Sequence, residues 1–378
     1  MSRVRTIAIG TFVLLLAATP FVPRGSDPDG SLTPGASLAD GRLSPELAAE
    51  VDRVVDAGLE LGRMSGKLSP EQLAQDLVRC ADFDGQRYCL HLGWTQSSPT
   101  DARARLARAA RTAAGARATE GTGDLDALAL LRRSATADPQ ERADAERREL
   151  TLAALSVDKV WRLRHDLQGV SLPAGYGTTA RAQQRKTRAD YPRRSVIMKP
   201  SRVAEQRRTY WCGPTTMQMI AWGWQHERKK QGRWADKLGT TTDGTAISDM
   251  VRVVNKVTGY DRDSRAGKYI VLDISHWSYE KWLLLQMRHI EDYRAPVVLH
   301  PVLLKRFYPY LDDDASGHFQ VGRGYDKRGD KPTQLGYFEP WNQQRFDPSE
   351  PYISRVQWRS AYKSYRANEA HFQQNIGV

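Results

Sequence analysis

The chain has 378 residues, of which 40% are apolar and ten are tryptophan, so it is long enough for two domains with a hydrophobic core. Its formal net charge is +12, and in an exported chain this charge favours anionic cell-envelope polymers or lipid headgroups over nucleic acid as partners. The three cysteines include no CxxC pair, so no common zinc site is predicted, and neither a metal nor a cofactor is expected.

The N-terminus is typical of an export signal. Arg3 and Arg5 precede an apolar run from Thr6 to Ala18, which is short for a membrane span and suits the hydrophobic region of a secretory signal. We therefore predict a signal peptide over residues 1–25, either cleaved or retained as an anchor, and a flexible spacer over residues 26–42. No later segment has the length and apolarity of a transmembrane helix, so we expect a secreted or envelope-associated protein.

Residues 43–168 are predicted to form an all-helical N-terminal region. Ser44-Pro45-Glu46 and Ser69-Pro70-Glu71 are the same helix start used twice, with a serine N-cap, a proline at the first helical position and an acid in the first turn. From Asp101 to Asp166 the sequence is rich in Ala, Arg, Leu and Glu, which favours helices, with a break at residues 121–124 (GTGD). The region is interpreted either as a pro-region that blocks the second half or as an interaction module.

Two of the three cysteines are predicted to pair. Cys80 and Cys89 lie nine positions apart around an Asp-Gly turn, which favours a local disulfide. Cys212 is then the unpaired thiol of an exported protein. Such a thiol is either a small core residue or a residue with a chemical task.

A basic linker over residues 169–195, rich in Gly and Thr, is predicted to separate the helical region from a second domain over residues 196–378, and it is an expected protease-sensitive site. In that domain a helix is predicted to begin at Cys212, because Pro214 suits a first helical turn and apolar residues follow with helical spacing up to Trp224. Cys212 is thus placed at a helix N-terminus, where the helix dipole lowers the pKa of a thiol.

The remainder of the second domain mixes helices with strands. The predicted helices are 212–225, 246–257 and 279–293, and the predicted strands are 268–274, 295–302, 318–325 and 335–340. The last two strands are joined by a polar turn and are expected to pair. Helices followed by strands indicate an α+β domain.

A thiolate nucleophile needs a base, and His318 is the predicted one because it opens a strand after a Ser-Gly pair. The other seven histidines are expected in ordinary surface or core roles. Glu339, with Asn342 as the alternative, lies at the end of the paired strand, from which either side chain would orient the imidazole; otherwise each is a solvated loop end. Gln206, six residues before Cys212, offers a side-chain N–H that would hold an oxyanion together with the Cys212 backbone N–H.

The order of Gln206, the CGP sequence at Cys212, His318 in GHFQVGRGYD and Glu339 in YFEPWN resembles the papain-like cysteine peptidases of the bacteriocin-processing type, the peptidase family numbered C thirty-nine, in their secreted stand-alone form. The resemblance covers about residues 196–356 and implies a papain-like α+β sandwich. It also implies that Cys212 is the nucleophile, His318 the general base and acid, Glu339 the orienter and Gln206 the oxyanion donor.

Two features depart from that family. Glu339-Pro340 stands where the family commonly has Asp-Pro, so Asn342 stays open as the orienter. The transporter segments of the family members that cut leader peptides are missing from this sequence, so cleavage of leader peptides is not implied.

We expect a secreted cysteine hydrolase that cleaves peptide or amide bonds through an acyl-thioester on Cys212. Its expected partners are a peptide or protein substrate and an anionic envelope polymer, without nucleic acid, and the chain is expected to be a monomer. Two alternatives stay open: a catalytically silent papain-like domain used for binding or structure, and an amidase that acts on cell-wall peptide.

Overall fold

The computed structural model describes residues 42–115, 121–174, 176 and 186–378. The predicted signal peptide, nearly all of the predicted spacer and part of the predicted basic linker lie outside these residues. Among the helices that the structure describes, none is long and apolar enough to cross a membrane.

The helices confirm most of the predicted helix positions. The described residues form the helices α1 (Pro45–Glu60), α2 (Pro70–Leu77), α3 (Pro99–Gly115), α4 (Ala127–Thr136), α5 (Pro139–Ala154), α6 (Val157–Gln168), α7 (Cys212–Gln225), α8 (Gln231–Leu238), α9 (Ile247–Val257), α10 (Tyr279–Met287) and α11 (Ala361–Ala370). The two predicted helix starts are confirmed: Ser44 caps α1 by accepting a hydrogen bond from the Leu47 N–H, and Ser69 forms a capping box with Gln72 in α2.

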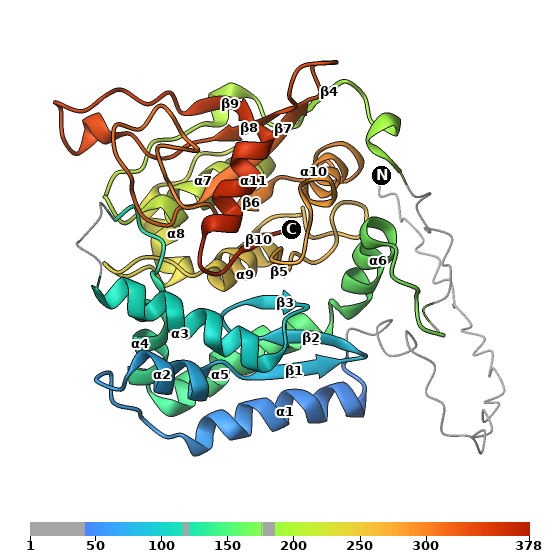
Figure 1. Cartoon of the computed structure of the whole chain (residues 1–378), viewed down its shortest axis with the longest axis vertical. Helices are drawn as coiled ribbons and strands as arrows, with labels where there is room; N and C mark the ends of the chain where they lie inside the picture. Colours follow the sequence, from blue (N-terminus) through green and yellow to red (C-terminus); the bar gives the residue numbers. More distant parts are fainter. Residues whose placement is uncertain (1–41, 116–120, 175, 177–185) are drawn as a thin grey trace, which may run out of the picture. The chain divides into compact units, whose positions relative to one another are not determined.

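All strands of the described residues belong to one ten-stranded sheet (Figure 1). The strands are β1 (Cys80–Phe83), β2 (Gln86–Cys89), β3 (Gly93–Thr95), β4 (Arg194–Val196), β5 (Val271–Asp273), β6 (Val297–Leu299), β7 (Gln320–Asp326), β8 (Gln334–Phe338), β9 (Val356–Ser360) and β10 (Asn375–Gly377). The strand order is β1-β2-β3-β5-β10-β6-β7-β8-β9, with β4 paired to β7 beyond the end of β6. The predicted hairpin of β7 and β8 is antiparallel, and the α+β fold class is confirmed.

The N-terminal region is helical, as predicted, but the prediction that it is all-helical is wrong, because it also contains the three short strands β1, β2 and β3. The predicted disulfide is confirmed, because Cys80 and Cys89 are bonded across the first two strands. The turn between them has two residues with positive φ, Asp84 and Gly85. These strands form because Phe83 and Tyr88 are buried against the core on one side of a hairpin. The buried side chains therefore recur at every second residue, as in a strand, and not with helical spacing.

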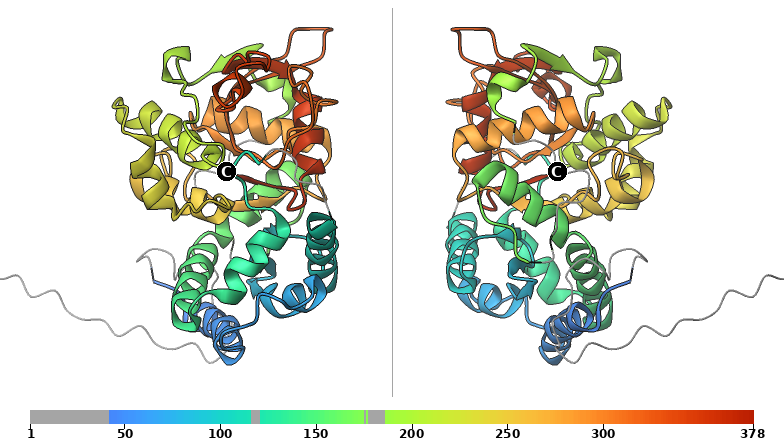
Figure 2. Two further views of the ribbon diagram at one scale, coloured as in Figure 1. Left: turned by 90° about the vertical axis from the view of Figure 1, so that its left-hand side faces the viewer. Right: turned by 90° about the vertical axis from the view of Figure 1, so that its right-hand side faces the viewer.

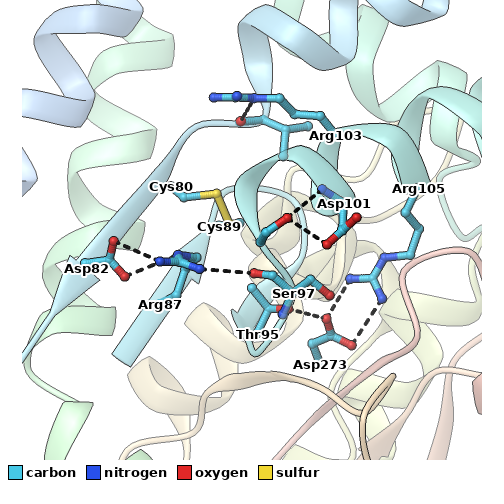
Figure 3. The surroundings of a disulfide bond; sticks show 12 residues. Cys80, Asp82, Arg87, Cys89, Thr95, Ser97, Asp101, Arg103, Arg105 and Asp273 are labelled. Carbon is cyan, nitrogen blue, oxygen red and sulfur yellow. Dashed lines mark hydrogen bonds and ion pairs between the residues drawn. A yellow bond between two sulfur atoms is a disulfide. The ribbon is translucent and has the colours of Figure 1, made fainter. Parts of the chain in front are cut away.

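The N-terminal strands connect directly to the second half of the chain. β3 pairs in parallel with β5 through Trp94 and Leu272. Asp273 on β5 accepts hydrogen bonds from the Thr95 hydroxyl at 2.6 Å and from the Arg105 guanidinium at 2.6 Å (Figure 3). The sheet therefore continues from the N-terminal region into the region of Cys212.

Helices cover both faces of the sheet. The side chains of β6 show the alternation: Val298 packs in one apolar cluster with residues of α7, α8 and α9, whereas Val297 and Leu299 pack in another with residues of α10 and α11. Figure 2 shows the yellow-green to yellow helices of the first group on the opposite side from the orange and red helices of the second. Cys212 belongs to the first layer and approaches the sheet at the start of β7.

Candidate active site

Cys212 is the first residue of α7, as predicted, and it is fully buried. It is the free cysteine of the described residues. The backbone N–H groups of Gly213 and Phe319 lie close enough to its sulfur to act on its pKa. Because Phe319 directly follows His318, the thiol lies beside the start of the strand that carries the predicted base.

The pKa of Cys212 is raised well above its usual value, which is opposite to the lowering predicted from its position at a helix N-terminus. Burial of the thiol is the largest cause, and the nearby Asp124 carboxylate raises the pKa further. The two backbone N–H groups act in the lowering direction but do not compensate. In the described arrangement the sulfur is therefore a neutral thiol at physiological pH.

His318 and Glu339 form a fully buried pair. His318 Nε2 lies 2.6 Å from Glu339 Oε1. The carboxylate therefore contacts Nε2 and leaves the other ring nitrogen, Nδ1, free of it. His318 Nδ1 is buried and has no hydrogen-bond partner among the described residues. An ionised Glu339 accepts the Nε2 proton, so Nδ1 keeps a lone pair that can take a proton.

The Glu339 carboxylate is held by three further donors. Oε1 also accepts from the Trp341 backbone N–H at 3.0 Å. Oε2 accepts from Tyr310 Oη at 2.9 Å and from Gln320 Nε2 at 2.7 Å. The alternative orienter, Asn342, is buried, but its Oδ1 has no hydrogen-bond partner among the described residues. The carboxylate that contacts His318 is thus that of Glu339.

The Gln206 side chain and the Cys212 backbone converge on one oxygen atom. Gln206 Nε2 donates to the Thr122 carbonyl oxygen at 3.2 Å, and the Cys212 N–H donates to the same oxygen at 3.2 Å. Gln206 Nε2 also lies 3.0 Å from the Arg208 carbonyl oxygen and 2.8 Å from the Thr209 carbonyl oxygen, so its two N–H groups are shared among three acceptors that fix the amide. Two fixed donors aimed at one carbonyl oxygen next to a thiol are the arrangement that stabilises an oxyanion.

A second polar cluster, which the sequence reasoning did not find, lies next to this site. Asp124, His300 and His371 are buried, and their side-chain ligand atoms lie within 4.8 Å of one another, close enough to hold a metal ion. The hydrogen bonds oppose that use, since His371 Nδ1 accepts the Gln373 N–H, which leaves the ring proton on Nε2, 2.7 Å from Asp124 Oδ2. A metal ligated by that Nε2 would require the other tautomer.

The proton positions in the cluster follow from its neighbours. Asn375 donates to the Leu92 carbonyl, so its Oδ1 faces His300 Nδ1 at 2.7 Å and requires a proton there. His300 Nε2 lies 2.9 Å from Asp124 Oδ1. Asp124 is consequently placed between two imidazoles. Burial acts to raise the pKa of Asp124, but the attraction of the two rings and their hydrogen bonds outweigh it and lower the pKa to about 2.

Three residues at this site escaped the sequence reasoning for physical reasons. Thr122 and Asp124 belong to the GTGD break, which indicated only a gap between helices. His371, expected to be a tail residue, is buried because the chain returns into the middle of the sheet as β10. A signal was present in Gly123, because its close approach to the Tyr210 backbone requires glycine.

Comparison with known proteins supports the assignment of the second domain. A family model with the description "Peptidase_C39 like family" matches residues 198–369, which include Cys212, Gln206, His318 and Glu339. This part of the chain is therefore similar to that family. No significant match was found among curated proteins or among solved structures.

Proposed function

We propose that the protein is a cysteine hydrolase that cleaves peptide or amide bonds through an acyl-thioester on Cys212. The observation that carries the proposal is the convergence of the Cys212 N–H and Gln206 Nε2 on a single peptide carbonyl oxygen. The His318–Glu339 pair beside it supplies a base whose free nitrogen is Nδ1. The family match to residues 198–369 supports the same class of chemistry.

The proposed reaction has two steps. His318 Nδ1 takes the Cys212 proton as the sulfur attacks the substrate carbonyl carbon, while Gln206 and the Cys212 N–H bind the negative oxygen. The carbon–nitrogen bond then breaks, and His318 returns the proton to the leaving amine. Glu339 holds the Nε2 proton and stabilises the imidazolium. Water, activated by the same imidazole, hydrolyses the thioester and releases the acid.

The proposal is tested with a peptide pool digested by the wild-type protein and by Cys212→Ala, His318→Ala and His276→Ala. The first two variants are expected to lose about a thousandfold in rate or more, because each removes a reacting group. His276→Ala is the matched control, since His276 is exposed and contacts Ser97. Peptide products are quantified by mass spectrometry, and a Cys212→Ala variant that cleaves at the wild-type rate would refute the mechanism.

A second candidate function, a catalytically silent domain used for binding or structure, is favoured by one observation. The thiol is buried and its pKa is raised, which is the opposite of what a nucleophile needs. Cleavage of the peptide pool separates the two candidates, because a catalytically silent domain leaves the pool uncut in the wild type and in every variant of the surrounding chain. An amidase acting on cell-wall peptide shares the chemistry, and a muropeptide digest run beside the peptide pool distinguishes the substrates.

We also propose that the protein acts outside the cytoplasm. Arg3, Arg5 and the apolar run that follows support export, and the disulfide between Cys80 and Cys89 suits an oxidising compartment. N-terminal sequencing of protein recovered from the medium and from the envelope fraction tests both export and signal cleavage. Recovery of the whole population from the cytoplasm would contradict this assignment.

A further inference from the structure

Residues 121–125 leave the helical N-terminal region and run across the candidate active site. They connect to α4 on one side, yet their hydrogen bonds are made with the second domain. Thr122 is fully buried, and Asp124 and Leu125 are buried as well. The position of this segment is therefore defined by the site and not by the helices around it.

The Thr122 carbonyl occupies the place of a substrate carbonyl. Its oxygen accepts from both donors that are proposed to bind the oxyanion, the Cys212 N–H and Gln206 Nε2, at 3.2 Å each. A substrate peptide that used these donors would have to put its own oxygen at the same point. The Thr122 carbonyl and a substrate carbonyl consequently exclude each other.

The segment is bound on both sides of this carbonyl in the manner of an extended peptide. On one side, the Thr122 N–H donates to Ser316 Oγ at 2.9 Å and the Thr122 hydroxyl donates to the Gly317 carbonyl at 2.5 Å. On the other side, the Gly123 carbonyl accepts from the Thr245 N–H at 2.9 Å, and the Leu125 N–H donates to the Thr245 carbonyl at 3.3 Å. Ser316 and Gly317 immediately precede His318, so the segment is bound next to the strand that carries the base.

The fit requires glycine at one position of the segment. Gly123 has a φ of +109°, and a Cβ on it would lie 2.3 Å from the Tyr210 carbonyl carbon. Gly121, two residues earlier, has nothing within 4 Å of a Cβ. An added methyl group would therefore clash with the Tyr210 backbone at Gly123 and would enter open space at Gly121.

Asp124 anchors the segment and acts on the thiol. Its carboxylate is held by His371 Nε2 at 2.7 Å and His300 Nε2 at 2.9 Å, both fully or almost fully buried. The same carboxylate is close enough to Cys212 to raise the pKa of the thiol. Departure of the segment would thus uncover the sulfur and remove a negative charge from its surroundings.

We propose that residues 121–125 are a built-in inhibitory segment that occupies the substrate site as a peptide does and must leave it before a substrate binds. The inference rests on the proposed function, because it takes Cys212 and Gln206 to be the groups that a substrate meets. Attachment to the chain gives the segment a high effective concentration at the site, which favours occupation over an added peptide. Molecules in which the segment has left the site are then a minor fraction, and only these molecules react.

The test compares Gly123→Ala with the matched control Gly121→Ala. The methyl group of the first variant cannot be accommodated against Tyr210 and is expected to displace the segment, whereas the control methyl group enters open space. We measure the rate of Cys212 alkylation by iodoacetamide at pH 8 by mass spectrometry; Cys80 and Cys89 are protected by their disulfide. Gly123→Ala is expected to react about tenfold faster than wild type or more, because the fraction of open molecules rises, and Gly121→Ala to match wild type.

Two further measurements keep the test decisive. A synthetic peptide with the sequence of residues 121–126, added to Gly123→Ala at millimolar concentration, is expected to slow alkylation again by refilling the site. If Gly123→Ala shows no cooperative thermal unfolding, Asp124→Asn takes its place, because it removes the charge that His300 and His371 hold. Asp126→Asn is its control, since Asp126 is exposed and only caps α4.

The outcomes separate this inference from the proposed function. Equal alkylation rates in Gly123→Ala, Asp124→Asn and both controls overturn the inhibitory segment, even where the peptide pool is cleaved. Faster alkylation in the two test variants without any cleavage of the pool supports the segment and refutes the hydrolase. Faster alkylation with faster cleavage supports both.

Discussion

Glu339 is one methylene longer than the aspartate expected at its position, and its surroundings show how the extra length is accommodated. Its two carboxylate oxygens accept four hydrogen bonds, from His318, Trp341, Tyr310 and Gln320. Four donors fix the position of the group, because a carboxylate offers about four acceptor sites and each of them has a partner. Asn342, which remained the alternative from sequence, has no such set of partners through its Oδ1.

Glu339→Gln is expected to lower kcat by about 100-fold with little change in KM, because the amide cannot stabilise the imidazolium and adds donors where only acceptors fit. Asn342→Ala is the comparison variant and is expected to keep kcat within about threefold of wild type. Both are assayed in the Gly123→Ala background as well as in the wild-type chain. A large loss in Asn342→Ala together with a small one in Glu339→Gln would transfer the orienting role to Asn342.

At the scale of single elements, the hairpin of β1 and β2 depends on a cross-strand disulfide. Cys80 and Cys89 are directly opposite each other in the register, so the bond closes the hairpin at its open end. β3 carries this hairpin onto β5 at Trp94 and Leu272. Loss of the disulfide is therefore expected to weaken the connection that β3 makes between the N-terminal strands and the rest of the sheet.

The double variant Cys80→Ala/Cys89→Ala is expected to lower the free energy of unfolding by roughly 2–3 kcal/mol, because a short cross-linked loop restricts the unfolded chain. The measurement is urea unfolding followed by tryptophan fluorescence. Dithiothreitol serves as the control, since it should destabilise the wild type by a similar amount and leave the double variant unchanged. An unaltered urea midpoint in the double variant would show that the hairpin is held by packing alone.

The elements also show which parts of the fold were predictable. α1 and α2 begin where their Ser-Pro-Glu signals place them, because capping is decided by a few neighbouring residues. β10 (Asn375–Gly377) was not predicted, since three residues carry no periodic pattern. It nevertheless lies in the middle of the sheet between β5 and β6, a place that only long-range pairing assigns.

At the scale of the whole molecule, the N-terminal helices and the second domain line an open cavity of about 710 Å³. It lies between α4, α5, α8 and α9 and is lined in part by Tyr88 and Glu149. Burial raises the pKa of Glu149 to about 7, and the Tyr88 hydroxyl donates to its carboxylate at 2.9 Å. The charge of this group therefore changes near neutral pH.

Glu149 makes the stability of the protein dependent on pH. Its pKa in the folded state lies above the value of the unfolded chain, so its contribution to stability is present below about pH 4.5 and is lost as the pH rises through 7. Glu149→Gln is expected to be more stable than wild type by roughly 1–3 kcal/mol at pH 8 and equally stable at pH 4.5. Asp144→Asn, exposed on the same helix, is the control and should show no such pH dependence. The comparison is made by urea unfolding at both pH values.

The sequence by itself determined the helix starts, the disulfide, the α+β class and three residues of the candidate site, Gln206, Cys212 and His318. These depend on local capping, on a turn between two cysteines and on a short motif around Cys212, all of which act over a few positions. The tertiary structure alone decided that Glu339 is the carboxylate against His318, because two strands must pair before their ends can be compared. It also decided that the Thr122 carbonyl accepts from the Cys212 N–H and Gln206 Nε2 and that the pKa of Cys212 is raised, because burial and contacts between segments some 90 positions apart are not encoded in any local pattern.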